Sequence, residues 1–417
     1  MRDRNWAGNV RYSASRVHRP GSLDELRAIV ATAPRIRTLG SRHSFNEIAD
    51  APEHVSLDRL QPELSIDRDA GTVTCSPWLT YGELAPRLHA AGLALPNLAS
   101  LPHISLGGAI ATATHGSGDR RGNLATAVAA LELVTSDGAV RALARGEADF
   151  AGVVVGLGAT GVVTRVTLDA EPSYELRQYV YEDLPWRSVE HEFDEITAAG
   201  ESVSIFTRWG TSAGMLWVKR RDPVRQGPLF GARPAAHQLH PIAGADPAAC
   251  SAQLGTPGPW FERLPHFRLE FTPGAGEELQ SEYLLARADA QAAIETVRSL
   301  APEIEPLLHI GEIRTVAGDD LWMSPQQGRD TIALHFTWRR EQQRVEQLLG
   351  ALEDALAPLR PRPHWGKLFA ADAVDLRTRY PRLADFARLL ARLDPRGAFR
   401  NDWLEQRVLG GEVGPQQ

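Results

Sequence analysis

The sequence predicts an α+β protein of two domains, on three observations. The chain has 417 residues, which is long for a single domain. Helical and strand-like patterns alternate up to Pro172. After Pro172, strand-like runs alternate with helical ones in a manner typical of an antiparallel sheet with helices packed on it. We therefore expect one domain over residues 1–172 and a second over 173–365, followed by a C-terminal segment, 366–417.

Local patterns place the elements of the first domain. Ser22 and Glu25 form a capping-box pattern that opens a helix, and Gly92 suits the end of another. The second helix is expected at Tyr81–Ala91. Strands are expected at Arg35–Leu39, Leu64–Asp67, Thr72–Cys75, Leu131–Thr135, Ala139–Leu143 and Val162–Leu168. The strands at Leu131–Thr135 and Ala139–Leu143 flank a Ser-Asp-Gly turn, which predicts a hairpin.

The sequence pattern changes in the second domain. Residues 220–260 are rich in Pro, Gly and Ala without sustained periodicity, so we expect loop. Strands are predicted at Phe267–Phe271, Leu307–Thr315 and Thr331–Trp338, and helices at Ala288–Leu300, Glu341–Leu356 and Arg382–Leu393.

Composition limits the class of partner. A net charge of -7 gives no reason to expect nucleic acid or an anionic membrane as a partner. Cys75 and Cys250 are too few for a disulfide framework or a zinc site, so we predict buried thiols and no metal centre. The N-terminus lacks the apolar stretch of a signal peptide, and no apolar run reaches the roughly 20 residues of a membrane span. We expect a cytoplasmic monomer.

Two stretches carry the residues of a ligand site. Leu39–Asn46 is a strand end that runs into Gly40, and successive backbone N–H groups of such a turn can converge on an anion. A surface turn histidine is the alternative for His43. Residues 96–118 are nearly all small, hydroxylated or glycine, which lets the backbone approach a flat ligand closely. A third Gly-rich piece at 156–163 resembles a dinucleotide fingerprint but lies far from the usual position.

Six strings in this order resemble the vanillyl-alcohol oxidase family of flavoproteins, in the branch of the alditol and aldonolactone oxidases. They lie at Gly40–Asn46, Leu95–Ser105, Ala113–Gly118, Glu312–Val316, His335–Trp338 and Pro363–Lys367. The resemblance covers essentially the whole chain. It implies a FAD-binding domain that includes the C-terminal segment, and a cap domain that builds the substrate pocket.

The resemblance also implies cofactor contacts. His43 is expected to bond covalently to FAD, and the Gly-rich turn before it to hold the pyrophosphate. The expected cofactor-binding residues are Leu39, Gly40, Ser41, Arg42, His43, Ser44, Phe45, Ser100, Ser105, Gly108, Thr112, Ala113, Thr114, His115, Val162 and His364. Arg42 departs from the pattern, which has Gly there; its side chain either restricts the turn or pairs with the pyrophosphate. With no cysteine between Cys75 and Cys250, we expect no second covalent bond.

Pairs two residues apart indicate a second set of site residues. On a strand, Glu312 and Arg314 share one face, as do His335 and Thr337. Exposed charge pairs and a solvated Lys367 are the alternatives from spacing alone. The resemblance implies that Ser100, Glu312, Arg314, Thr337 and Lys367 bind a polyol, whose row of hydroxyls needs several fixed donors and acceptors.

The implied reaction is oxidation of a terminal hydroxyl of an alditol such as xylitol or sorbitol, with dioxygen reduced to hydrogen peroxide. The hydroxyl proton needs an acceptor. Lys367 is the first candidate, as base or alkoxide partner, and His335 the second. Repulsion from Arg314 would favour neutral Lys367, and Glu312 could cancel it. The rival hypotheses are an aldonolactone oxidase, a dehydrogenase with another electron acceptor, and a binding protein without turnover.

Overall fold

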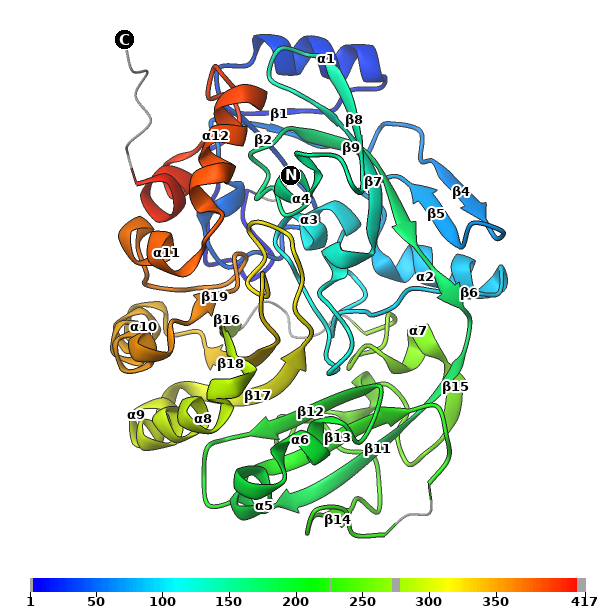
Figure 1. Ribbon diagram of the computed structural model, residues 1–417, viewed down its shortest axis with the longest axis vertical. Coiled ribbons are helices and arrows are strands. Elements are labelled where there is room, and N and C mark those ends of the chain that lie inside the picture. The colour runs from blue at the N-terminus through cyan, green and yellow to red at the C-terminus, as the bar shows by residue number, and fades with distance from the viewer. Residues whose placement is uncertain (1–2, 225–226, 272–277, 411–417) are drawn as a thin grey trace.

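The chain folds into two packed halves, each built on its own β-sheet (Figure 1). The computed structural model describes residues 3–224, 227–271 and 278–410. One half carries three smaller sheets, of five, three and two strands, and the other a single large antiparallel sheet of nine strands. This arrangement is the predicted α+β architecture.

The first half contains a parallel sheet in the order β1-β3-β2, an antiparallel sheet in the order β4-β5-β9-β7-β8 and an antiparallel pair, β10-β6. Its strands are β1 (Arg16–His18), β2 (Ile36–Thr38), β3 (Glu53–Val55), β4 (Leu64–Asp67), β5 (Thr72–Cys75), β6 (Leu93–Ala94), β7 (Val128–Val134), β8 (Val140–Ala144), β9 (Val162–Asp169) and β10 (Glu171–Pro172). Its helices are α1 (Leu23–Thr32), α2 (Tyr81–Ala90), α3 (Leu106–Ala111) and α4 (Phe150–Val154). β7 pairs with β8 in the predicted hairpin, and Ser22 caps α1 by accepting from the backbone N–H of Glu25. The other half of the expected capping box differs, because the Glu25 carboxylate accepts from the backbone N–H of Gly21.

The large sheet runs in the order β14-β11-β13-β12-β17-β18-β16-β19, with β15 paired to β11 beside this path. Its strands are β11 (Glu175–Leu184), β12 (Ser202–Thr207), β13 (Gly214–Arg220), β14 (Arg233–Pro234), β15 (Pro257–Pro259), β16 (Glu278–Ala286), β17 (Leu308–Val316), β18 (Thr331–Arg339) and β19 (Arg362–Pro363). The helices of this half are α5 (Trp186–His191), α6 (Phe193–Thr197), α7 (Trp260–Arg263), α8 (Ala290–Ser299), α9 (Ala301–Ile304) and α10 (Gln342–Leu356). Strands at 308–316 and 331–339 and helices at 290–299 and 342–356 confirm the predictions there.

One predicted strand is wrong. Phe267–Phe271 forms no strand and contributes a single bridge, between Phe267 and Cys250. β18 pairs with β17 on one side and with β16 on the other, and β16 is a strand that the sequence did not predict. Its polar residues Glu278, Gln280 and Glu282 alternate with apolar ones, but Glu is disfavoured in strands on average. The strands β11, β12 and β13 were likewise not named.

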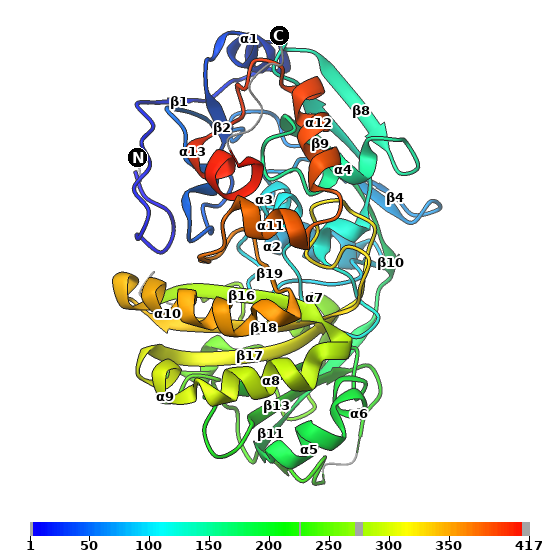
Figure 2. The ribbon, with the colours of Figure 1, turned by 60° about the vertical axis from the view of Figure 1, so that its left-hand side comes forward.

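Helices α8, α9 and α10 lie along one side of the large sheet (Figure 2). Tyr283 points to this side, since its hydroxyl donates to Glu353 of α10 at 2.8 Å. Neighbouring residues of a strand point to opposite faces. Gln280 and Glu282 therefore face the other half of the molecule, where a cavity lies.

The C-terminal helices α11 (Ala373–Arg379), α12 (Leu383–Leu393) and α13 (Asp402–Leu404) pack against the first half (Figure 1). The backbone N–H of Ile36 donates to the carbonyl of Ala398 at 2.7 Å. The Asn401 amide donates to the carbonyls of Glu47 and Asp50. These contacts fix the C-terminal segment beside β2.

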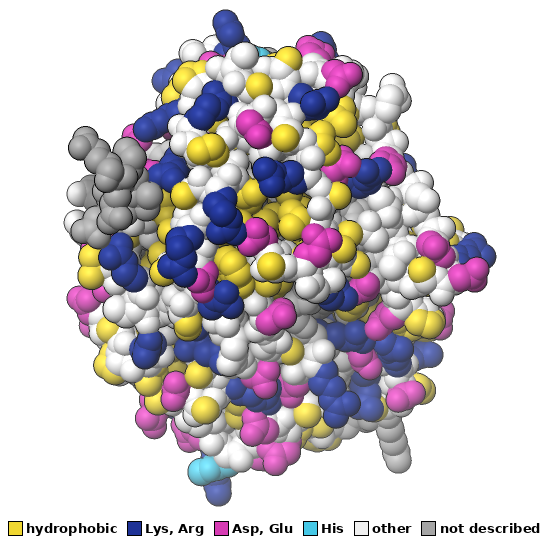
Figure 3. Space-filling model, turned by 45° about the horizontal axis from the view of Figure 1, so that its top comes forward, with side chains coloured by type: hydrophobic (Ala, Val, Ile, Leu, Met, Phe, Trp, Pro, Cys, Tyr) yellow, Lys and Arg dark blue, Asp and Glu magenta, His cyan; other side chains and the backbone are white. Residues whose placement is uncertain are grey.

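Basic and acidic side chains are intermingled on the face drawn in Figure 3, and no single sign dominates that view. Within the described ranges, the structure holds no helix long and apolar enough to cross a membrane.

Candidate functional site

A cavity of about 510 Å³ lies between the two halves and is lined by residues from both, together with the C-terminal part of the chain. Nineteen of the predicted site positions line it, and they come from strands, turns and loops far apart in the sequence. They are Leu39, Gly40, Ser41, Arg42, His43, Ser44, Phe45, Ser100, Ser105, Gly108, Thr112, Thr114, His115, Glu312, Arg314, His335, Thr337, His364 and Lys367, with Ser100 serving in both predicted sets.

Ala113 and Val162 are the exceptions among the predicted positions. Neither lines the cavity. The Ala113 side chain is fully buried, and Val162 packs in a core cluster with Leu26 and Phe399. Their side chains thus serve packing in this structure, and their expected contact with a cofactor stays a prediction.

The turn that follows β2 is tied to the start of α3. The backbone N–H of Ser41 donates to Oγ of Ser105 at 3.2 Å, and that of Ser105 donates to Oγ of Ser41 at 3.1 Å. A Cβ at Gly40 would lie 2.4 Å from Oγ of Ser105. Glycine is therefore required for this close approach. Arg42 has a φ of +62°, a left-handed conformation that explains why the family pattern has glycine at its position.

His43 is held in a buried position beside the cavity. Its ring stacks on Trp6, with centroids 5.3 Å apart and planes at 22°. Burial lowers the pKa of His43 to about 4, so its imidazole is neutral near pH 7. Within the described structure, its buried Nδ1 has no hydrogen-bond partner. A neutral ring with an unpaired buried nitrogen suits a bond to a ligand in the cavity.

These residues fit FAD. A glycine turn packed against the N-terminus of α3 suits a pyrophosphate. The small residues Gly108, Thr112 and Thr114 leave room for a flat ring beside His43. Ser41, Ser105 and the backbone of the turn are the groups that would hold the phosphates.

Register brings the charged residues of the cavity into one row. Glu312 of β17 lies opposite His335 of β18, and His335 lies opposite Glu282 of β16. Arg314 follows two residues after Glu312 on the same face, as the period-two pattern predicts. Within the row, Nε of Arg314 lies 3.6 Å from Oε2 of Glu312.

Glu282 is the centre of this row, and the sequence analysis missed it. Its carboxylate, 1% exposed, accepts from Arg314 at 2.5 Å and from Nζ of Lys367 at 2.6 Å. Nε2 of His115 lies 3.3 Å from it. Burial alone would raise the pKa of Glu282, but Lys367, His115 and Arg314 outweigh it and the pKa lies well below its usual value. Glu282 is therefore an anion.

Lys367 joins Glu282 to His335. Its Nζ lies 2.8 Å from Nδ1 of His335, whose Nε2 lies 3.2 Å from Oγ1 of Thr337. Burial lowers the pKa of Lys367, while Glu282 raises it. Burial lowers the pKa of Lys367 more than repulsion from Arg314 does, and the main opposing anion is Glu282, with Glu312 a smaller contributor. Burial also holds the pKa of His335 well below its usual value.

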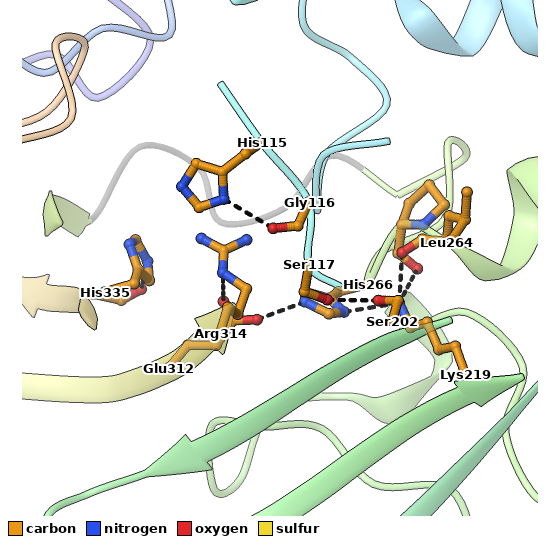
Figure 4. Close-up of polar contacts among 12 residues, drawn as sticks. His115, Gly116, Ser117, Ser202, Lys219, Leu264, His266, Glu312, Arg314 and His335 are labelled. Atoms are coloured by element: carbon orange, nitrogen blue, oxygen red, sulfur yellow. Dashed lines mark hydrogen bonds and ion pairs between the residues drawn. The ribbon is translucent and has the colours of Figure 1, made fainter. Parts of the chain in front are cut away.

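His266 and Lys219 extend the row behind Glu312 (Figure 4). Nε2 of His266 lies 2.8 Å from Oε1 of Glu312, and Nδ1 lies 3.0 Å from Nζ of Lys219. Burial alone would raise the pKa of Glu312, but Arg314 and His266 hold it below its usual range. Sequence reasoning missed both, because a lysine inside a strand and a histidine in a loop carry no local signal.

Ser100 and His364 complete the wall of the cavity. The carbonyl of Ser100 accepts from the backbone N–H of His266 at 3.1 Å. Nδ1 of His364 accepts from the backbone N–H of Gly366 at 3.1 Å, and burial lowers the pKa of His364 well below its usual value. A neutral His364 thus shapes the loop that carries Lys367.

Comparisons with known proteins agree with this geometry. A FAD-binding domain model matches residues 14–144, and a D-arabinono-1,4-lactone oxidase model matches residues 277–407. An alditol oxidase of Streptomyces sp. is 49% identical over 97% of this chain and 99% of its own. An L-gulono-1,4-lactone dehydrogenase of Mycobacterium tuberculosis is 30% identical over 97% of this chain and 98% of its own.

Solved structures share the fold. A cholesterol oxidase from B. sterolicum superposes with a TM-score of 0.76 at 16% identity, over 96% of this chain and 95% of that one. A solvent-stable cholesterol oxidase gives a TM-score of 0.78 at 17% identity, over 96% of both chains. At such low identity the likeness concerns the fold alone.

The matched FAD-binding domain and the charged cavity beneath the large sheet define a two-domain FAD-dependent oxidoreductase. The likeness to alditol oxidase spans nearly the full length of both chains. The chain belongs to the vanillyl-alcohol oxidase family of flavoproteins, in the branch that contains alditol oxidase and the aldonolactone oxidases.

Proposed function

We propose that this protein oxidises the terminal hydroxyl of an alditol, such as xylitol or sorbitol, to the aldose, with dioxygen reduced to hydrogen peroxide. One observation carries the proposal: a row of buried donors and acceptors lines the cavity beside the turn that contains Gly40. The row consists of Glu312, Arg314, His335, Thr337 and Lys367. The 49% identity to alditol oxidase supports the same substrate class.

The row suits a polyol because each substrate hydroxyl is both donor and acceptor. Glu312 accepts, Arg314 donates, and Thr337 and Ser100 do either. A ligand that lacks these hydroxyls would leave the buried groups unpaired, which disfavours its binding.

We further propose that FAD is bonded covalently to His43. The neutral, stacked ring with a buried, unpaired nitrogen supports this. Bound FAD would supply the hydride acceptor and the reaction with dioxygen.

Lys367 is our candidate for the group that takes the hydroxyl proton. Burial makes its neutral amine accessible, and the adjacent Glu282 stabilises the ammonium ion that forms when the amine accepts a proton. The carboxylate thus acts as a counter-ion to a base that becomes positively charged. His335, whose Nδ1 contacts Lys367, is the second candidate.

Steady-state peroxide release with xylitol, sorbitol and a gulono-lactone tests the function. We expect turnover with the polyols and peroxide in step with dioxygen consumption. Turnover confined to the lactone would indicate an aldonolactone oxidase. Oxidation that needs an artificial electron acceptor would indicate a dehydrogenase instead.

A further inference from the structure

A fully buried lysine behind the substrate row has no role in the proposed chemistry. Lys219 of β13 is 1% exposed. Its Nζ contacts the carbonyl of Leu264 at 2.5 Å, the carbonyl of Pro265 at 3.2 Å and Nδ1 of His266 at 3.0 Å. A lysine is almost never buried so fully unless it is paired, so this position demands an explanation.

The three acceptors around Lys219 match the three hydrogens of an ammonium ion. Two of the acceptors are carbonyls, which cannot donate, so they use two hydrogens in either protonation state. The third hydrogen, which the neutral amine lacks, is directed at Nδ1 of His266. When Lys219 is charged, Nδ1 must therefore be the unprotonated nitrogen of the ring.

The tautomer of His266 then decides its contact with Glu312. With Nδ1 unprotonated, the neutral ring carries its hydrogen on Nε2, which lies 2.8 Å from Oε1 of Glu312 and donates to it. The opposite tautomer would turn a lone pair toward the carboxylate. In proteins generally, the hydrogen-bond partner of one ring nitrogen of a histidine determines which of its two nitrogens carries the hydrogen.

We propose that Lys219 and His266 form a buried positioning relay that orients Glu312 toward the polyol, with Lys219 selecting the tautomer of His266. The proposal rests on the proposed function, because it gives Glu312 the task of accepting from a substrate hydroxyl. Both relay residues act through Glu312 and are positioning residues.

The surroundings of the relay support a fixed ring. Phe206, Trp217 and Phe267 meet the His266 ring edge-on, with ring centroids 5.2, 5.5 and 6.5 Å from it. The backbone N–H of His266 donates to the carbonyl of Ser100. The same segment therefore fixes two predicted substrate contacts, Ser100 and Glu312, relative to each other.

The charged groups around Lys219 and His266 determine the pH range in which Lys219 is protonated and His266 is neutral. Lys219, Glu312 and Arg314 face His266, and the thiol of Cys250 also faces Lys219. Burial, followed by repulsion from Lys219, lowers the pKa of His266 to about 4, so the ring stays neutral. Burial lowers the pKa of Lys219 to about 7. Loss of its proton at higher pH would release Nδ1 and weaken the hold on Glu312.

The test is the substitution Lys219→Met, which keeps the length of the side chain and removes the donors. We expect KM for xylitol to rise by about 5–50-fold, as for a lost charged hydrogen bond, with kcat within about twofold. In the parent, KM should rise with pH as Lys219 loses its proton; in Lys219→Met it should be high at every pH. A Lys219→Met enzyme with the parent's KM and pH profile would overturn the proposal.

Two matched variants separate positioning from packing. Ser251→Ala removes the hydroxyl that donates to the same Pro265 carbonyl at 2.7 Å but leaves the relay intact, so KM should stay within about twofold. His266→Gln keeps an N–H donor within reach of Glu312 and should restore much of the binding that His266→Leu loses. Equal KM values for the two His266 variants would show that only volume matters.

A third measurement needs no substrate and does not depend on the activity of any variant. Nitrogen-15 NMR of histidine-labelled parent enzyme at about pH 6, below the pKa of about 7 of Lys219 and with the His266→Gln spectrum for assignment, should show Nε2 protonated and Nδ1 unprotonated. Protonated Nδ1 at this pH would refute the relay. A parent enzyme that oxidises no polyol would instead refute the proposed function, and the tautomer result would be unaffected.

Discussion

Nζ of Lys367 lies 2.6 Å from Oε2 of Glu282, a carboxylate on the neighbouring strand β16 that is 1% exposed. The same carboxylate accepts from Arg314. One buried anion thus compensates two cations of the cavity. Without it, buried Lys367 would lose its carboxylate partner and Arg314 would keep only Glu312, at high energetic cost.

Lys367→Met should slow the chemical step. A base or alkoxide partner acts mainly in the transition state, so the limiting rate of flavin reduction by xylitol should fall by about 10²–10⁴-fold. Anaerobic rapid mixing measures this step without interference from dioxygen. If the variant reduces its flavin at the normal saturated rate, Lys367 is not catalytic and His335 becomes the residue to test.

The limiting rate of flavin reduction should rise with pH in the parent. A base acts in its neutral form, so the rate increases as pH rises through the pKa of Lys367, which burial places below 10.5. Glu282 raises this pKa, so Glu282→Gln should move the rise to lower pH and reduce the maximal rate. Stopped-flow reduction between pH 6 and 10 tests this, at roughly the range where a depressed lysine titrates. A rate that falls as pH rises would contradict the assignment.

Glu312→Gln and Arg314→Ala should act mainly on substrate binding. The first replaces an anionic acceptor by an amide and the second removes a fork of donors, each at a cost of about 1–3 kcal/mol in kcat/KM. Steady-state kinetics with xylitol should show the loss in KM. A large fall in kcat with unchanged KM would assign these residues to the chemical step.

His43→Ala should release the flavin from the chain. The parent should keep its yellow colour on the protein after acid precipitation, whereas the variant should lose it to the supernatant. His103→Ala is a matched control, because His103 influences His43 electrostatically but its Nε2 contacts the carbonyl of Leu269. Parent enzyme whose flavin is extracted by acid would refute the covalent bond.

Arg42→Gly tests the departure from the family pattern. Glycine relieves roughly 1–2 kcal/mol of left-handed strain and costs about 0.5–1 kcal/mol in conformational entropy, so thermal stability should hardly change. In a His43→Ala background, where FAD binding is noncovalent, the substitution should weaken FAD affinity if the guanidinium pairs with the pyrophosphate. Fluorescence titration of FAD measures this, and unchanged affinity would show that Arg42 merely tolerates the turn.

Local spacing explains why much of the candidate site could be predicted. Glu312 and Arg314 share a face because a strand alternates with period two, and the same rule pairs His335 with Thr337. The turn at Gly40 depends on a close approach that glycine alone permits. The strand pairs depend on neighbours in the sequence, so the residues themselves reveal them. The partner that makes glycine necessary at position 40 is Ser105, which the fold brings to it.

The position of Glu282 in the site could not be predicted from the sequence. A strand was predicted at Phe267–Phe271 and none at Glu278–Ala286, because the first run is richer in aromatic residues, which favour strands. Ala113 and Val162 matched the family pattern, yet their side chains pack away from the cavity. The relation of a residue to a cavity depends on which face the fold buries.

The sequence alone thus determined the α+β class, the glycine turn beside His43 and the paired residues of the substrate row, because these rest on short-range geometry and side-chain chemistry. Tertiary structure decided which charges meet. The register of β16, β17 and β18 aligns Glu282, His335 and Glu312, and the packing of β13 against the loop at His266 buries Lys219. Buried charges need partners in space, and those partners come from strands that the sequence separates widely.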